Sequence, residues 1–181
     1  MRLRREQPAD HDAVRDVHLH AFGEHDHGPV VARLVDDLRA EATLSLVAEA
    51  PDGPDSGRIL GSVMFTPGLL DAPPRLVDVH VLSPLAVAPA HQRQGIGQAL
   101  VREGLRLLTE IHVPLVFLEG DPGYYSRLGF TPGGAHGFRK PSLRIPDAAF
   151  QVARLPAYEP WMTGTLVYSP TFWHHDCVGL R

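Results

Sequence analysis

One segment in the middle of the chain constrains the fold more than any other. Alternating valines predict a β-strand over Leu76–Val87, with Ser83-Pro84 as an interruption because proline cannot donate to a sheet ladder. A short loop follows, and apolar residues at helical spacing then predict a helix over Gly95–Ile111. The helix begins with Gly95-Ile96-Gly97, and glycines at such a junction let the backbone approach a ligand closely. Free N–H groups at a helix start favour an anion such as a pyrophosphate.

A Rossmann dinucleotide site would be one use of such a unit. Glu119 ends the next expected strand, roughly 20 residues on, where a ribose-binding acid would sit. Two features oppose this interpretation. Leu100 stands where the third glycine belongs, and seven residues separate Val87 from Gly95, whereas a Rossmann turn is immediate. We therefore reject the dinucleotide fingerprint.

The rest of the chain predicts alternating short elements around one sheet, a mixed α/β fold. The Pro- and Gly-rich stretch Pro51–Gly57 is interpreted as a hairpin turn, and Asp121-Pro122 as the capped start of a helix that Gly129 ends. The remaining expected elements are strands over 2–7, 43–49, 58–66, 113–118, 150–155 and 164–168, and helices carrying 13–21 and 31–38.

Two motifs in this region resemble those of the GNAT acetyltransferases. The acyl-CoA motif of that family, Leu-x-Val-x-Pro-x-x-(Arg/Gln)-x-x-Gly-x-(Gly/Ala), is matched by Leu85, Val87, Pro89, Gln92, Gly95 and Gly97. A second signature, an aromatic-Tyr-x-x-x-Gly-Phe run, is matched by Tyr124-Tyr125 and Gly129-Phe130. The resemblance covers Leu76–Phe130, and Gly120–Phe130 is similar to a small-molecule-type branch of predicted acetyltransferases.

The resemblance implies a GNAT-like fold: a mixed, mostly antiparallel sheet with a central splayed pair of parallel strands, flanked by helices. Under this interpretation residues 1–181 form a single domain, with core motifs over 76–130 and C-terminal strands within 150–175.

The resemblance also implies that the chain binds acetyl-CoA as a cosubstrate. The backbone of Leu85–Val87 would pair with the pantetheine arm, the loop Gln92–Gly97 would wrap the pyrophosphate with Arg93 supplying charge, and the Val87 N–H would hold the oxyanion. Tyr125 would protonate the leaving thiolate, although its ring could instead pack the helix against the sheet. The complete set implied for the cofactor is Leu85, Ala86, Val87, Gln92, Arg93, Gln94, Gly95, Ile96, Gly97 and Tyr125.

The general base is less well defined. Many family members place a carboxylate on the strand before the acyl-CoA motif, but this chain has Val81 and Ser83 there. We assign the catalytic role to His80, on the polar face with Asp78; Asp78 itself, Glu119 or a water chain are the alternatives. A partly buried histidine paired with its strand neighbour is an equally good structural explanation.

Composition bounds the remaining functions. The net charge of −4 at pH 7 gives no basic field for nucleic acid or for an anionic membrane. No apolar run approaches the ~18 residues of a membrane span, and the charged N-terminus is unlike a signal peptide. Together with a single cysteine, Cys177, this predicts a cytoplasmic protein. None of the eleven histidines has zinc spacing, so no metal is expected.

The sequence therefore predicts an N-acetyltransferase that acts by direct attack of a primary amine of a small molecule or protein on acetyl-CoA. The alternative is a non-catalytic acyl-CoA-binding regulatory module. The acceptor, the use of longer acyl-CoAs and a homodimeric state stay open at this stage.

Overall fold

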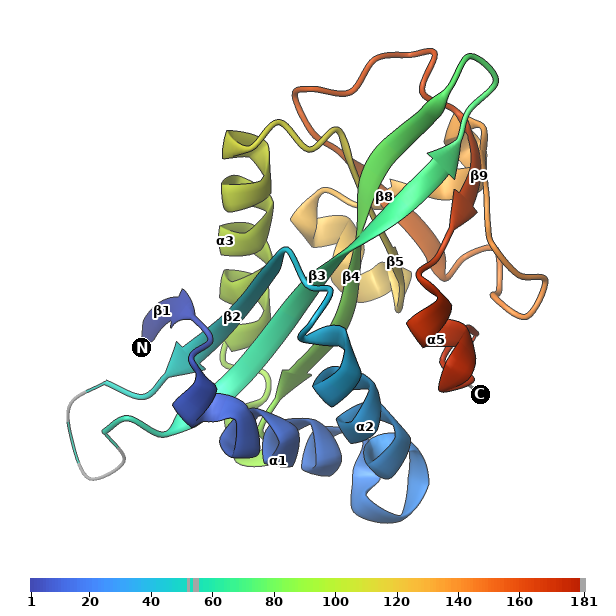
Figure 1. Ribbon diagram of the computed structural model, residues 1–181. Helices are drawn as coiled ribbons and strands as arrows, with labels where there is room; N and C mark the ends of the chain where they lie inside the picture. The colour runs from blue at the N-terminus through green and yellow to red at the C-terminus, as the bar shows by residue number, and fades with distance from the viewer. Residues whose placement is uncertain (52, 54–55, 180–181) are drawn as a thin grey trace. The chain divides into compact units, whose positions relative to one another are not determined.

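The computed structural model describes residues 1–51, 53 and 56–179. Its chain divides into two compact units: unit 1 is Met1–Phe65 with Pro84–Gly104, and unit 2 is Thr66–Ser83 with Leu105–Arg181. Three elements contribute to both units, namely β3 (Ile59–Asp71), β4 (Leu76–Val87) and α3 (Ile96–Glu110) (Figure 1). The expectation of one domain over residues 1–181 stays a prediction.

Unit 1 is built on an antiparallel ladder. Strand β1 (Arg2–Arg5) pairs with β2 (Leu44–Glu49), which pairs with the first half of β3 in the register Leu44↔Phe65. Helices α1 (His11–Ala21) and α2 (Gly28–Leu38) pack against each other. The apolar stripe expected on the second helix is buried, as its residues Val31, Leu34, Val35 and Leu38 are at most 2% exposed.

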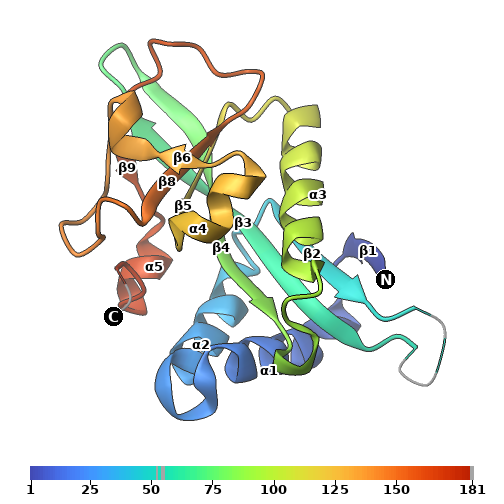
Figure 2. The same cartoon turned by 180° about the vertical axis from the view of Figure 1, so that it is seen from behind.

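Different helices pack on the two faces of this ladder. Ser62 and Phe65 stand an odd number of positions apart in β3, so their side chains point to opposite faces. Ser62 contacts His18 of α1, whereas Phe65 lies against Gly104 of α3. A Cβ at Gly104 would stand 2.1 Å from Phe65 Cε2, so only glycine permits this close approach. Figures 1 and 2 show α1 and α2 on one side of the strands and the start of α3 on the other.

Unit 2 contains the expected parallel pair. Strand β4 pairs with β5 (Leu115–Glu119) in the register His80↔Val116 and Val81↔Phe117, and β5 continues to Glu119 along its antiparallel partner β8 (Phe150–Arg154). The second half of β3 pairs with β9 (Gly164–Val167). The short strands β6 (Thr131–Pro132) and β7 (Phe138–Arg139) pair with β8 and β9. The predicted fold class is confirmed: mixed α/β, mostly antiparallel, with β4 and β5 parallel.

Two local expectations differ from the structure, and a third falls partly outside the described residues. Strand β3 extends to Asp71 instead of ending at Thr66, because Gly68 serves close packing and not a turn: a Cβ there would stand 3.3 Å from the Val167 carbonyl oxygen. The C-terminal stretch 150–175, expected to contain strands, also contains a short helix, α5 (Pro170–His174). The expected turn over residues 51–57 includes Asp52, Pro54 and Asp55, which lie outside the described residues.

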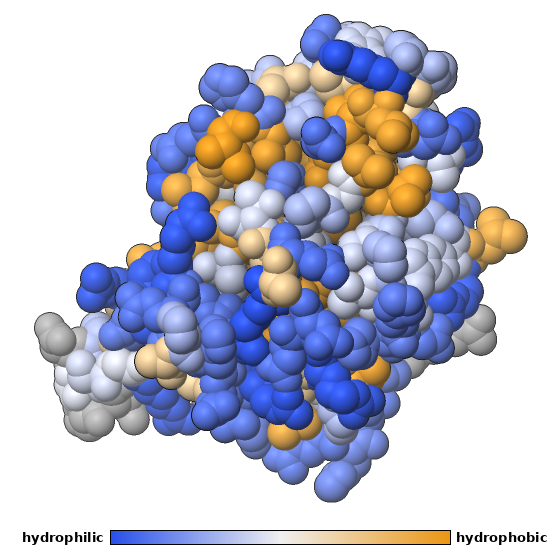
Figure 3. All heavy atoms as spheres, viewed as in Figure 1, coloured by the Kyte–Doolittle hydropathy of each residue, from blue (hydrophilic) through white to orange (hydrophobic). Residues whose placement is uncertain are grey.

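The helix expected after Asp121 is a single turn, α4 (Pro122–Tyr125), followed by a 3₁₀ turn. Its capping is as predicted, since Asp121 Oδ1 accepts the Gly123 N–H at 2.9 Å. Gly129 ends the segment at φ 89°, in the left-handed region that favours glycine. Figure 3 shows apolar surface gathered over the distal ends of β3 and β4 and over β9, where Leu69, Leu76 and Val167 are exposed.

Candidate active site

The loop Gln92–Gly97 in unit 1 has the backbone of an anion-binding turn. It follows a 3₁₀ turn and leads directly into α3, and its first four residues are exposed. Arg93 and Gly95 adopt left-handed backbone angles, φ 60° and 83°. Such reversals turn successive N–H groups toward a common concavity at a helix start, which suits phosphate oxygens. A Cβ on Gly95 would meet nothing within 4 Å, so the backbone angle, and not lack of space, favours glycine here.

Two glutamine side chains of the loop donate hydrogen bonds to the backbone that precedes it. Gln92 Nε2 donates to the Val87 carbonyl oxygen at 3.1 Å, and Gln94 Nε2 donates to the Ala90 carbonyl oxygen at 3.4 Å. The Ala88 N–H donates to the Leu60 carbonyl oxygen at 2.9 Å, which ties the end of β4 to β3. The two glutamines implied as cofactor contacts therefore hold the loop in shape in this structure.

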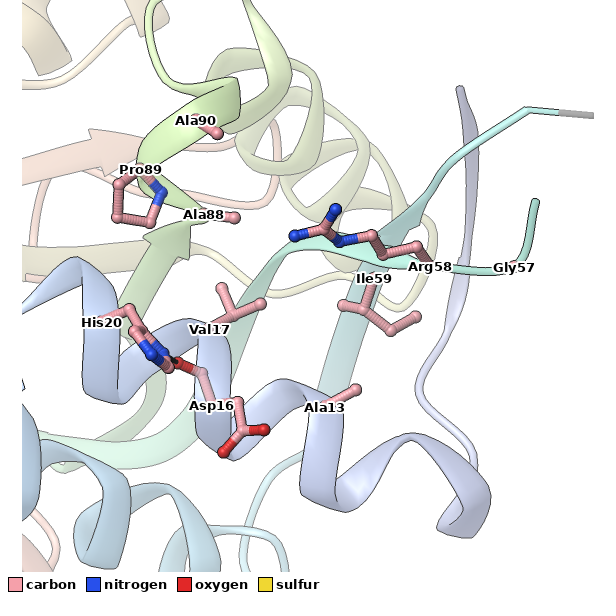
Figure 4. A pocket seen from close by; sticks show the side chains of 10 residues that line it. All are labelled: Ala13, Asp16, Val17, His20, Gly57, Arg58, Ile59, Ala88, Pro89 and Ala90. Atoms are coloured by element: carbon pink, nitrogen blue, oxygen red, sulfur yellow. Dashed lines mark hydrogen bonds between the residues drawn. The ribbon is translucent and has the colours of Figure 1, made fainter. Parts of the chain in front are cut away.

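A cavity of about 490 Å³ opens in unit 1 beside the start of this loop (Figure 4). Its floor is apolar, and its charged or titratable residues are Asp16, His20 and Arg58. His20 Nδ1 lies 2.6 Å from the Asp16 carbonyl oxygen, one helical turn away. This cavity could not be predicted from the sequence, because its lining residues come from separate elements. The lining residues are Ala13, Asp16, Val17, His20, Gly57, Arg58, Ile59, Ala88, Pro89 and Ala90.

In unit 2, Tyr125 ends α4 with its ring held between aromatic neighbours. The ring packs edge-on against Tyr124 and Phe130, with centroids 4.8 and 5.7 Å away. Gly120 makes room for it, since a Cβ there would stand 2.4 Å from Tyr125 Cε2. Burial, and secondarily the neighbouring Tyr124, raises the pKa of the Tyr125 hydroxyl, which therefore stays protonated at neutral pH. Both roles considered for Tyr125 from the sequence are compatible with this arrangement: its ring packs against neighbouring side chains, and its hydroxyl is protonated at neutral pH.

His80 lies in β4, opposite Val116 of β5, and is buried. Burial lowers the pKa of its imidazole, and the charge of the exposed Asp78 opposes that effect. Val81 is also buried and Ser83 is half-buried, so this stretch of β4 carries no carboxylate. The residue predicted as the base is therefore a largely desolvated, neutral imidazole at neutral pH.

Glu119, an alternative base from the sequence, ends β5 and is bound by the C-terminal segment. Its Oε2 accepts the Gly179 N–H at 2.9 Å, and its carboxylate also accepts the Tyr168 hydroxyl. Burial is the largest influence and raises the pKa of the Glu119 carboxyl, against the hydrogen bonds and Arg144, which lower it. The sequence did not indicate these two contacts of Glu119, because contacts across 49 and 60 positions leave no local pattern.

Among residues 1–51, 53 and 56–179, no group of three or more His, Cys, Asp or Glu side chains is arranged to hold a metal ion. Within the same part of the chain, no helix has the length and apolar character needed to cross a membrane. Cys177, which we did not assign to chemistry, is buried.

Comparison with known proteins decides the family. Residues 42–132 match the family model described as an acetyltransferase (GNAT) domain, and this span includes the 92–97 loop and Tyr125. The chain is also 34% identical over 164 residues to the uncharacterized N-acetyltransferase YjhQ of Escherichia coli (strain K12), covering 86% of this chain and 85% of that protein. The chain belongs to the GNAT acetyltransferase family.

Two solved GNAT structures resemble the chain over nearly its whole length. YhbS from Escherichia coli, crystallised in complex with CoA, has a TM-score of 0.82 and 32% identity, covering 94% of this chain and 91% of YhbS. A GNAT acetyltransferase from Brucella melitensis, in complex with acetyl-CoA, has a TM-score of 0.73 and 32% identity over 94% of this chain and 97% of its own. Tyr168 and Gly179, which contact Glu119, lie beyond residues 42–132 that the family model matches.

Proposed function

We propose that this GNAT acetyltransferase transfers an acetyl group from acetyl-CoA to a primary amine. The observation that carries the proposal is the 92–97 loop, where two left-handed residues precede a helix start, in a chain similar to GNAT proteins bound to CoA and acetyl-CoA. An exposed loop of this geometry fits a pyrophosphate, and Arg93 adds a positive charge to the backbone N–H groups.

The strand before the loop would supply the backbone contacts to the pantetheine arm. The N–H of Val87 is the group assigned to the acyl oxygen, and the Val87 carbonyl oxygen accepts a hydrogen bond from Gln92 Nε2. A fixed N–H donor stabilises the negative charge that develops on that oxygen in the transition state. The backbone of Leu85 and Ala86 would make the remaining hydrogen bonds to the pantetheine arm. Ile96 and Gly97, also assigned to the cofactor, are buried at the helix start.

The chemical step is direct transfer without an acyl-enzyme. The amine nitrogen forms a bond to the acyl carbon, the carbon–sulfur bond breaks, and the electron pair leaves with sulfur. Tyr125 donates its proton to that sulfur, and a proton lost from the nitrogen restores the tyrosine through solvent. Cys177 takes no part, because it is buried and its Sγ–H is directed at the His175 carbonyl oxygen.

Release of free CoA thiol from acetyl-CoA, measured across a panel of small amines and lysine-containing peptides, tests the proposal. We expect release that depends on one class of amine and exceeds the hydrolysis seen without acceptor. Binding of acetyl-CoA with no acceptor-dependent release would support the alternative, a regulatory module that keeps the cofactor site. The same assay with propionyl- and butyryl-CoA defines the acyl range.

Two further expectations from the sequence stay predictions. A cytoplasmic location is tested by fractionation of the source cells, and a homodimer is tested by sedimentation of the purified protein over a range of concentrations.

A further inference from the structure

One histidine lies within the apolar face that α1 presents to the sheet in unit 1. His18 has no solvent exposure, and the other buried residues of α1 are Val14 and Val17. The Nδ1 atom of His18 lies 3.0 Å from the Val14 carbonyl oxygen and 3.5 Å from Oγ of Ser62, which is fully buried in β3. Burying a polar ring costs free energy that a leucine would not, so the imidazole points to a role for its ring nitrogens.

The ring of His18 also meets the strand that leads to the 92–97 loop. The Pro84 carbonyl oxygen acts on the imidazole as a second backbone acceptor, in the same sense as the Val14 oxygen. Nε2, across the ring from Nδ1, is buried, and among the described residues no partner lies at direct hydrogen-bonding distance from it. His18 therefore links α1 to both β3 and β4, and one of its ring nitrogens is available to an acceptor such as the Pro84 oxygen.

Pro84 comes directly before the stretch of β4 to which the main-chain contacts with the cofactor are assigned, Leu85–Val87. Proline has no N–H, so Pro84 cannot donate to a neighbouring strand. In the part of the chain that the structure describes, the register of β4 with β5 ends at Val81, before this stretch begins. The start of the stretch is therefore held by fewer backbone hydrogen bonds than a regular strand inside a sheet.

The far end of the stretch is anchored to β3, because the Ala88 N–H donates to the Leu60 carbonyl oxygen at 2.9 Å. Helix α1 lies along the same part of β4. Val17, next to His18 in the helix, lines one cavity together with Ala88 (Figure 4). The contact of His18 with Pro84 thus comes from a helix already packed beside β4, and it acts at the end of the stretch that has fewer backbone anchors.

We propose that His18 is a positioning residue for the cofactor: its imidazole contacts the Pro84 carbonyl and so fixes the main chain of Leu85–Val87 for pairing with the pantetheine arm. The inference rests on the proposed function, because it uses the cofactor contacts assigned there. The pyrophosphate loop has its own hydrogen bonds from Gln92 and Gln94, so its shape does not depend on His18. Loss of the imidazole therefore affects the two parts of the cofactor differently.

A truncated ligand measures that difference. Adenosine 3′-phosphate 5′-diphosphate keeps the phosphates of CoA and lacks the pantetheine arm, so the ratio of its Kd to the Kd of acetyl-CoA reports the contribution of the arm. In His18→Leu we expect this ratio to fall about tenfold, the worth of one main-chain hydrogen bond, while the Kd of the truncated ligand stays unchanged. Calorimetric titration at a temperature where the variant is fully folded gives both constants. A purely structural role leaves the ratio unchanged, whatever the melting temperature.

Two amide substitutions show which ring nitrogen is responsible. His18→Gln places an amide nitrogen near the position of Nε2, and His18→Asn places one near the position of Nδ1. We expect His18→Gln to restore the wild-type ratio to within about threefold, because its amide can donate to the Pro84 carbonyl. His18→Asn keeps a group for Val14 and Ser62 only and should behave like His18→Leu.

Ser62→Ala is a milder variant, which serves if the His18 variants do not fold. It removes the hydroxyl that contacts the ring and should lower the ratio by about threefold. Thr66→Val is the matched control. Thr66 is also fully buried in β3, and its side chain points to the same face because it stands four positions beyond Ser62. Thr66→Val should keep the wild-type ratio.

The role of His18 is contradicted if His18→Leu keeps the wild-type ratio, if His18→Asn restores it and His18→Gln does not, or if Ser62→Ala and Thr66→Val behave alike. Should the wild-type protein bind acetyl-CoA no more tightly than the truncated ligand, the assigned pantetheine pairing fails and the role of His18 fails with it. Absence of amine-dependent CoA release contradicts the proposed transfer instead, and the binding ratio still decides the role of His18.

Discussion

His18 should make the stability of this protein depend on pH between neutrality and pH 4. The side chain lies in α1 with no solvent exposure, and its Nδ1 lies 3.0 Å from the Val14 carbonyl oxygen. Burial is the main cause that lowers the pKa of the imidazole from 6.5 to about 4. In the unfolded chain the ring is exposed and takes up a proton at its ordinary pKa. Acid therefore favours the unfolded state.

The sign and size of the His18 contribution to the free energy of unfolding follow from proton linkage. A group whose pKa is lowered by folding contributes stability above its unfolded pKa, and that contribution is lost as pH falls toward the folded value. The interval from 6.5 to about 4 corresponds to a limit of about 3 kcal/mol, at about 1.4 kcal/mol per pH unit. Linkage gives a loss of about 2 kcal/mol between pH 7 and pH 5.

Urea unfolding of the wild type and of His18→Leu at pH 7, 6 and 5 measures this contribution. Leucine removes the titration, although it also gives up the contact with Ser62 Oγ, so the variant should be the less stable protein at pH 7. Other groups titrate in both proteins and cancel in the difference. The stability gap should move in favour of the variant by about 2 kcal/mol from pH 7 to pH 5. Parallel pH dependences for the two proteins would refute the buried, neutral state of His18.

Two functional substitutions and one pH profile complete the set. Gly95→Val forces a branched side chain to φ 83° and should abolish the rise in melting temperature caused by acetyl-CoA; an unchanged rise would move the phosphate site elsewhere. Tyr125→Phe should lower kcat by roughly 10² with acetyl-CoA affinity retained, while Tyr124→Phe stays near wild type; the opposite result would place the acid at Tyr124. Because the pKa of the Tyr125 hydroxyl is raised, the rate should show no fall from ionisation of this tyrosine up to pH ~10; an alkaline fall near pH 8 would contradict its assignment as the acid.

Local sequence patterns predicted the helices and strands whose conformation depends mainly on neighbouring residues. The amphipathic helices, including the one that starts at the glycine pair, and the Asp121 cap were predicted, because periodicity and capping act over a few neighbouring residues. The extension of β3 through Gly68 was missed because glycine is normally a breaking signal. Only the approach of Val167, nearly a hundred positions away, shows that the glycine serves packing.

The same distinction between local and long-range information applies to the candidate site. Loop and tyrosine residues followed from motifs, whereas the surroundings of Glu119 depend on Tyr168 and Gly179, which are far away in sequence. A strand-end glutamate in a sequence is usually a solvated charge, and only the folded C-terminal segment changes its chemistry. Burial and directed donors determine whether a carboxylate is a base, and both are properties of tertiary structure.

Burial raises the pKa of both Tyr125 and Glu119, with different consequences for the two side chains. For Tyr125, burial keeps the proton on the hydroxyl at neutral pH, so a proton donor is present when the carbon–sulfur bond breaks. For Glu119, burial raises the pKa of the carboxyl, and the hydrogen bonds from Tyr168 and Gly179 act against that effect. The same physical cause, loss of water around the side chain, therefore favours the protonated form of both groups.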